Sequence, residues 1–143
     1  MARMAERAPH RIELRVYWED TDAAGIVYYA NYLRFAERGR TELLRALGVG
    51  QRRMAEEQGI AFAVRRCTCE YIRPARLDDA LVVETAVARA AGAAIEMRQD
   101  ILRGGELLAR LDVTVACVGA GGRPARLPPA LRHALAAFVA EPS

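Results

Sequence analysis

Two carboxylates, Asp20 and Asp22, lie in a short polar loop that precedes a long helical pattern, with Gly25 between them and the helix. The N-terminus of a helix presents unpaired backbone N–H groups and a partial positive charge. Such donors can hold a carbonyl oxygen and stabilise the oxyanion that forms when the carbonyl is attacked. A nearby carboxylate can attack the carbonyl or activate a water. The loop therefore has the parts needed to transfer an acyl group to water.

The same carboxylates also fit other roles. Asp is frequent at helix caps and in turns, so Asp20 and Asp22 could simply shape the loop. A metal pair is a third interpretation, but no cluster of further ligands accompanies the D-x-D spacing, and the histidines are His10 and His133. We expect no metal and no other cofactor.

Apolar periodicity predicts the elements that position this loop. Alternation predicts a strand over 11–18, with Ile12, Leu14, Val16 and Trp18 on its apolar side. From about Tyr28 the period becomes helical, with an apolar side made of Tyr32, Leu33, Ala36, Leu43, Leu44 and Leu47, and Gly48 ends the helix. A helix over 51–58, strands over 60–71, 81–89, 93–102 and 106–118, and a terminal helix over 128–139 follow. This order predicts an α+β fold in which an antiparallel sheet of about five strands wraps around one long central helix.

Composition limits the class of protein. The 143 residues fit one domain, 1–143, and about half of them are apolar. No apolar run approaches the ~20 residues that span a bilayer. The charged N-terminus lacks the apolar segment of a signal peptide, and we expect residues 1–10 to be flexible. The net charge of +3 comes from scattered arginines, which argues against nucleic acid and suits an anionic small molecule or an acidic protein.

The cysteines indicate a reducing compartment. Cys67, Cys69 and Cys117 are odd in number, and Cys67 and Cys69 point the same way from one predicted strand. We therefore expect structural cysteines in a cytoplasmic protein.

The segment EDTDAAGIVYYANYLRFAERGRTELL resembles the signature of the 4-hydroxybenzoyl-CoA thioesterase family. The stretches FAVRRCTCEYIRPARLDD and ARLDVTVACV add a resemblance to its Tol-Pal-associated acyl-CoA thioesterases. The similarity runs from about Arg11 to Leu131. It implies a single hotdog domain that hydrolyses an acyl-CoA thioester without a cofactor. It also implies a homodimer with one continuous sheet, or a homotetramer.

The resemblance assigns roles to particular residues. Asp22 matches the family's catalytic carboxylate, as nucleophile or as general base. The backbone N–H of Tyr29 matches the group that polarises the thioester carbonyl, and Gly25 matches the glycine that lets the loop approach the thioester. For the phosphates of coenzyme A the candidates are Arg73, Arg76 and Arg89, with plain surface arginines as the alternative.

Two departures from the subgroup concern the substrate. Tol-Pal-type members usually carry His where this chain has Tyr29, and often Tyr where it has Trp18. We therefore expect catalysis without histidine and leave the acyl group open as short, long or aromatic. Met54, Ile60 and Phe62 are candidates for the acyl pocket or for the core, and Glu37 and Arg40 have the i, i+3 spacing of a helical ion pair.

Two rival functions remain. A hotdog dehydratase generally uses a histidine, and none lies near the motif in sequence. A non-catalytic or weakly catalytic module that binds acyl-CoA or acyl carrier protein is the rival from another class, and an intact Asp22 argues against it.

Overall fold

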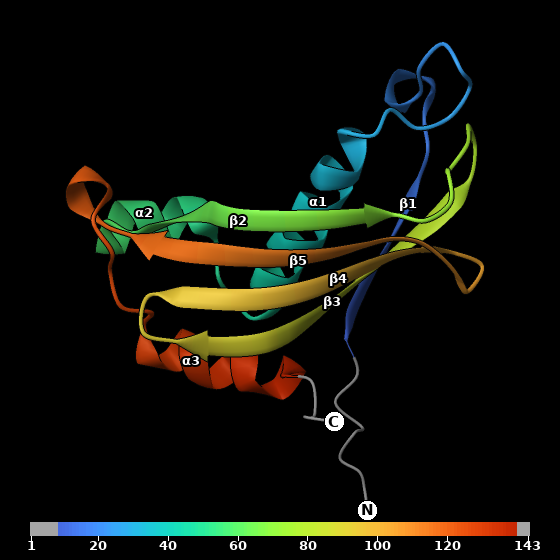
Figure 1. Ribbon diagram of the computed structural model, residues 1–143. Helices are drawn as coiled ribbons and strands as arrows, with labels where there is room; N and C mark the ends of the chain where they lie inside the picture. The colour runs from blue at the N-terminus through green and yellow to red at the C-terminus, as the bar shows by residue number, and fades with distance from the viewer. Residues whose placement is uncertain (1–8, 140–143) are drawn as a thin grey trace, which may run out of the picture.

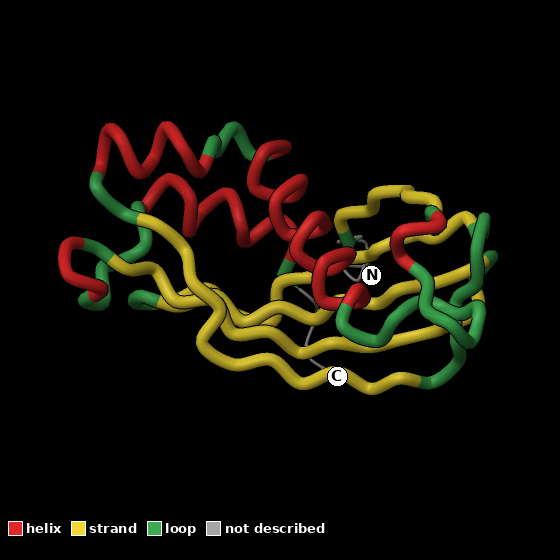
Figure 2. Tube along the Cα trace, turned by 90° about the horizontal axis from the view of Figure 1, so that it is seen from above, coloured by secondary structure: helices red, strands yellow, loops and turns green. Residues whose placement is uncertain are grey.

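The computed structural model describes residues 9–139 (Figure 1). Its elements are β1 (His10–Arg15), η2 (Trp18–Asp20), α1 (Asn31–Ala46), α2 (Gln51–Gln58), β2 (Ala61–Tyr71), β3 (Ala80–Ala91), β4 (Ala94–Arg103), β5 (Glu106–Val118), η3 (Ala120–Gly122), α3 (Pro129–Leu135) and η4 (Ala136–Phe138). One antiparallel sheet has the strand order β1-β3-β4-β5-β2. Helix α1 lies across one face of it (Figure 2). The predicted α+β fold with five strands and one long helix is confirmed, and most of the expectation for residues 1–10 lies outside the described residues.

The core lies between α1 and the sheet. The apolar side of α1 that the sequence predicts is buried, apart from Leu33, which is 42% exposed, and the half-buried Leu47. Gly39 allows a close approach, since a Cβ there would lie 2.7 Å from Cγ1 of Val83 on β3. The missing side chain of Gly39 thus sets how close the helix lies to the sheet.

A buried polar network joins α1 to the middle of the sheet. Gln99 on β4 is fully buried and donates to the carbonyl of Ala36 (2.7 Å) and to Oγ1 of Thr85 (3.0 Å). Its Oε1 accepts from Nη1 of Arg40 at 2.9 Å. Burial lowers the pKa of Arg40, while the charge of Glu37 acts in the opposite direction. Arg40 therefore bonds to the sheet, whereas the sequence spacing suggested a pair with Glu37.

Two element boundaries near the carboxylates differ from the prediction. β1 ends at Arg15, because the Asp20 carboxylate accepts the Tyr17 N–H at 2.8 Å and closes a turn. The prediction that Trp18 faces the core is wrong, since it begins η2 and is 80% exposed. α1 begins at Asn31, after a turn in which the Asn31 N–H bonds to the Tyr28 carbonyl. The predicted terminal helix is shorter, comprising α3 and η4.

Strand β2 is an edge of the sheet with little cover. It pairs with β5, and most of its residues are exposed, including Val64 (50%) and Tyr71 (47%). An uncovered edge with apolar side chains is a ready template for pairing with another chain. No helix in the described part of the chain is long and apolar enough to cross a membrane.

Candidate active site

Asp22 lies in a tight loop between η2 and α1. Thr21 and Val27 form a bridge across the loop, and the Asp22 N–H bonds to the Ile26 carbonyl at 2.9 Å. The Gly25 N–H bonds to the Asp22 carbonyl at 2.9 Å, and Gly25 has φ +79°. This left-handed conformation is strained for other residues, so the glycine is needed to close the loop.

The two carboxylates differ in how they are used. Asp20 is partly buried; its carboxylate holds the Tyr17 N–H and its carbonyl accepts the Tyr28 N–H at 2.9 Å. Asp22 is exposed, and its Oδ1 accepts the Ala24 N–H at 2.8 Å. Its Oδ2 has no hydrogen-bond partner within the described range. Both residues thus shape the loop, and Asp22 keeps an oxygen free for a ligand.

Tyr29 lies in the turn just before α1. The N–H groups of its neighbours Tyr28 and Asn31 are bonded, to the carbonyls of Asp20 and Tyr28. Within residues 9–139, those of Tyr29 and Ala30 donate no hydrogen bond. They lie at the positive end of the α1 dipole, as an oxyanion site requires. Tyr29 therefore precedes the helix by two residues, whereas the sequence suggested that it lies within its start.

Tyr71, at the end of β2, holds the carbonyl side of this turn. Its hydroxyl donates to the Tyr29 carbonyl at 3.2 Å, and its ring stacks edge-on against Tyr29 and Tyr32, with centroids 6.1 and 5.4 Å away. Burial and a hydrogen bond with Cys69 raise the pKa of Tyr71 to about 12, so its hydroxyl stays protonated. Sequence reasoning missed this residue. The only available signal was its place in the stretch that resembles the family.

The loop over residues 72–79 is the neighbour of the Asp22 loop. The Ala75 carbonyl accepts the Val27 N–H at 2.8 Å, and the Ala75 N–H donates to the hydroxyl of Tyr32 at 2.9 Å. Ile26 and Arg76 form a further antiparallel bridge. The backbone around Asp22 is thus held by the chain that connects β2 to β3.

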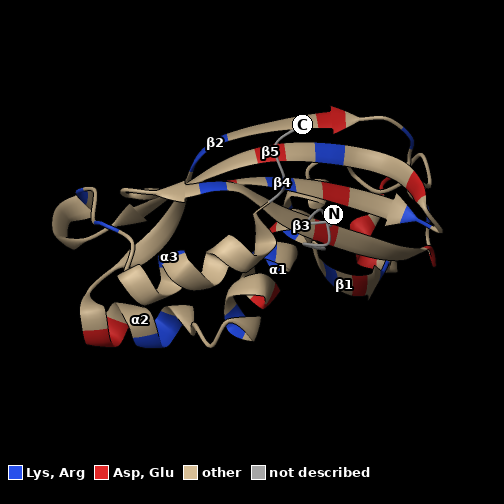
Figure 3. Ribbon diagram, turned by 90° about the horizontal axis from the view of Figure 1, so that it is seen from below, with Lys and Arg blue, Asp and Glu red and all other residues tan. Residues whose placement is uncertain are grey.

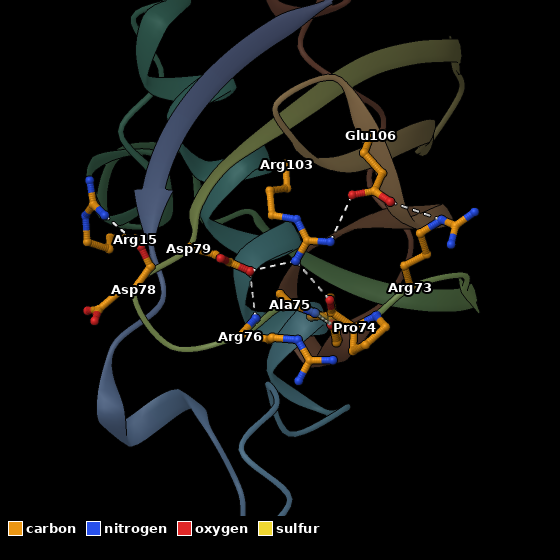
Figure 4. Close-up of polar contacts among 10 residues, drawn as sticks. Arg15, Arg73, Pro74, Ala75, Arg76, Asp78, Asp79, Arg103 and Glu106 are labelled. Atoms are coloured by element: carbon orange, nitrogen blue, oxygen red, sulfur yellow. Dashed lines mark hydrogen bonds and ion pairs between the residues drawn. The ribbon is translucent and has the colours of Figure 1, made fainter.

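The three candidate arginines do not come together. Arg73 and Arg76 lie on the 72–79 loop, where Arg73 Nε is 3.1 Å from Oε2 of Glu106 (Figure 4). Among the residues described, the Arg76 guanidinium has no ion pair or hydrogen bond. Arg89 lies near the other end of β3, roughly 30 Å along the strand from Ala80, which follows the loop, at about 3.3 Å per residue. Of the three, Arg76 is the one whose backbone bridges to the Asp22 loop, at Ile26, and Arg73 lies three residues before it.

Two adjoining grooves run between α1 and the β2 side of the sheet. The first, of about 300 Å³, begins at Leu33 in the first turn of α1, at the same helix end as Tyr29. The second, of about 130 Å³, lies further along the helix and includes Phe62. Both are lined by Glu37, Arg40 and Val64. Met54 instead lines a separate cavity of about 400 Å³ between α2 and α3.

No histidine lies at the Asp22 loop in the described structure. His10 begins β1 at the end remote from the loop and contacts Phe138, and His133 is exposed on α3. Over residues 9–139 no three His, Cys, Asp or Glu side chains are grouped as a metal site would need. The three cysteines are free.

Comparison with known proteins identifies the family. Residues 16–135 match the family described as the thioesterase-like superfamily. The acyl-CoA thioesterase YbgC of Haemophilus influenzae is 48% identical over 108 residues, which are 76% of this chain and 79% of that protein. A probable thioesterase from Bartonella henselae is 40% identical, with a TM-score of 0.82 over 85% of this chain and 100% of its own.

A more distant structure supports the fold. A mutant of 4-hydroxybenzoyl CoA thioesterase in complex with 4-hydroxybenzoyl CoA superimposes with a TM-score of 0.82 over 87% of this chain and 96% of its own, at 24% identity. The resemblance found in the motif, the five-stranded sheet around α1 and these matches agree. The chain belongs to the thioesterase-like superfamily and has its hotdog fold.

Proposed function

We propose that this protein hydrolyses acyl-CoA thioesters, with Asp22 as the catalytic carboxylate and the backbone N–H of Tyr29 as the oxyanion donor. The observation that carries the assignment is that the segment leading into α1 contains both a free carboxylate oxygen, on Asp22, and unbonded N–H groups, on Tyr29 and Ala30. Relatives named as acyl-CoA thioesterases support the substrate class.

The reaction follows from these groups. As a general base, Asp22 takes a proton from water while the water oxygen bonds to the thioester carbon. As a nucleophile, its oxygen forms that bond itself and water then cleaves the anhydride. In both routes the carbonyl oxygen becomes an oxyanion near the Tyr29 N–H, the C–S bond breaks, and the thiolate leaves and is protonated. Each preorganised donor typically contributes about 10²–10³ in rate.

The acyl group is proposed to lie in the grooves between α1 and β2. Their entrance at Leu33 is at the same helix end as Tyr29, and apolar side chains such as Val64 and Phe62 line them. Arg76, whose guanidinium makes no hydrogen bond or ion pair in the described structure, is the better placed candidate for a phosphate of coenzyme A or of acyl carrier protein. Arg73 is a weaker candidate because it already pairs with Glu106, which also pairs with Arg103. Arg89, near the other end of β3, could serve only a site formed with another chain.

The protein is proposed to act as a dimer joined at β2, with a tetramer as a further step. The exposed edge of β2 supports this proposal, because edge pairing would cover Val64 and extend the sheet. A cytoplasmic location is proposed with it and is supported by three free cysteines.

The test is thiol release from aliphatic and aromatic acyl-CoAs by wild type and by Asp22→Asn. Asn keeps an oxygen for the Ala24 N–H, so the loop is expected to stay folded, while kcat falls at least about a hundredfold. Asp20→Asn is the matched control and should lose less activity than Asp22→Asn. If wild type binds acyl-CoA or acyl carrier protein without releasing thiol, the binding module replaces the enzyme.

A further inference from the structure

The 72–79 loop, which holds the Asp22 loop, has little apolar packing of its own. Ala75 is its fully buried residue, and the others are exposed or half-buried. Asp78 has φ +71°, a left-handed conformation that Asp adopts more readily than most residues. Polar contacts must therefore keep this loop in place.

Backbone bonds to Leu108 and Val16 hold parts of the loop, and among the side chains outside the loop Arg103, the last residue of β4, makes the most contacts with it (Figure 4). Its Nη1 lies 2.8 Å from Oδ2 of Asp79 and 3.2 Å from the Pro74 carbonyl, and its Nη2 lies 2.9 Å from Oε1 of Glu106. The guanidinium thus joins two points of the loop, Pro74 and Asp79, to the β4–β5 hairpin. Because the guanidinium is planar and forked, its bonds to Asp79, Pro74 and Glu106 have fixed directions relative to one another.

Asp79 is the residue of the loop that forms the ion pair with Arg103. Its Oδ2 also accepts the Arg76 N–H at 2.8 Å, and Arg76 forms the backbone bridge to Ile26. Burial would raise the pKa of Asp79, but the hydrogen bonds from Arg103 and the Arg76 N–H outweigh it, so the pKa is lowered. The carboxylate is charged throughout the neutral range.

We infer that Arg103 and Asp79 are positioning residues for the catalytic loop. Arg103 bonds to Asp79 and to the Pro74 carbonyl, and these two bonds fix the stretch 74–79, which includes Ala75. The Ala75 carbonyl in turn holds the N–H of Val27, which is five residues from Asp22. Neither side chain is proposed to touch the substrate. The inference rests on the proposed function for its catalytic consequence, but the effect on the loop does not depend on it.

A second ion pair in the same sheet provides a matched control. Arg110 on β5 contacts Asp100 on β4 through two bonds of 2.8 and 2.9 Å. The side chains of Arg110 and Asp100 are 38% and 20% exposed, which is similar to the 31% and 22% of Arg103 and Asp79. This pair joins the neighbouring strands β4 and β5 at directly opposite positions, and neither of its two bonds reaches a loop; Figure 3 shows that these strands carry both acidic and basic residues. If the Arg103–Asp79 pair only stabilised the sheet, removing either pair would have the same effect on kcat.

The experiment compares Arg103→Met with Arg110→Met. We expect kcat for thiol release to fall about 10–100-fold in the first variant with KM unchanged, since small misplacements of reacting groups cost that much. Arg110→Met should keep its kcat. Arg103→Lys, which retains the charge but not the fork, should fall between wild type and Arg103→Met.

Amide hydrogen exchange separates this inference from the proposed function. Exchange at Val27 should rise in Arg103→Met and stay at the wild-type level in Arg110→Met, because only the first releases the Ala75 carbonyl. Equal exchange, or equal losses of kcat in the two variants, overturns the inference. If wild type releases no thiol, the proposed function fails, and exchange at Val27 alone decides whether Arg103 positions the loop.

Discussion

Gln99→Leu is expected to destabilise the protein by about 2–4 kcal/mol, although Leu is apolar and similar in size. The substitution removes two neutral hydrogen bonds, to the Ala36 carbonyl and to the Thr85 hydroxyl, each contributing about 1 kcal/mol. It also removes the bond from Arg40, and bonds to charged groups contribute about 1.5–3 kcal/mol. Burial of the Leu side chain offsets part of this loss.

Urea unfolding followed by circular dichroism measures this change. The midpoint should fall at an unchanged slope, which indicates a loss of stability rather than a different unfolded state. Gln58→Leu, at an exposed position on α2, is the control and should shift stability by no more than about 0.5 kcal/mol. A cost below about 1 kcal/mol for Gln99→Leu would refute the view that this network joins α1 to the sheet.

A double-mutant cycle tests the cause. In Gln99→Leu the half-buried Arg40 loses its partner, whereas in the double variant with Arg40→Met no charge is left without one. The double variant should therefore lose less stability than the two single losses together, by more than about 0.5 kcal/mol. Additive losses would mean that the bond between these side chains contributes nothing.

Three further predictions concern the site. Tyr71→Phe keeps the ring but removes the bond to the Tyr29 carbonyl, so kcat should fall about 3–10-fold with little change in KM, and an unchanged kcat would show that this bond does not hold the turn. Because the folded pKa of Asp79 is lowered, its pair stabilises the fold above the unfolded value of about 3.9 and is lost as pH falls through the folded value. Acid titration of unfolding should therefore be shallower in Asp79→Asn than in wild type, and identical curves would contradict this. Val64→Trp should reduce kcat/KM for long acyl chains roughly tenfold and leave short chains unaffected, and an equal loss for both would place the acyl group outside the grooves.

Much of the fold could be predicted from the sequence. Strand periodicity over 106–118 and helical periodicity over 51–58 correspond to β5 and α2 at both ends, because local pattern and tertiary burial agree there. The family was recognisable because its motif is long and contiguous. Asp22, Tyr29 and Gly25 lie in one loop for the same reason, and their catalytic roles stay predictions.

The pattern failed where side chains outside the local periodicity decide the conformation. Trp18 continues the apolar alternation of β1, but the Asp20 carboxylate turns the chain before it and exposes it. Arg40 has the spacing to pair with Glu37, yet Gln99 accepts its hydrogen bond, because α1 crosses β4 at that point. The first outcome depends on a local polar turn that apolar periodicity does not show, and the second on a contact between residues 59 apart in sequence.

The sequence by itself determined the fold class, the family and the loop in which the carboxylates lie, since each depends on residues that are close along the chain. Only the tertiary structure decided that Tyr71 holds the Tyr29 turn, that Arg103 holds the 72–79 loop, and that Arg89 lies far from both. Tyr71 and Arg103 act on partners 24 to 42 residues away in sequence. Such partners are brought together only by the strand order of the sheet, which places the end of β2, the start of β3 and the end of β4 around one loop.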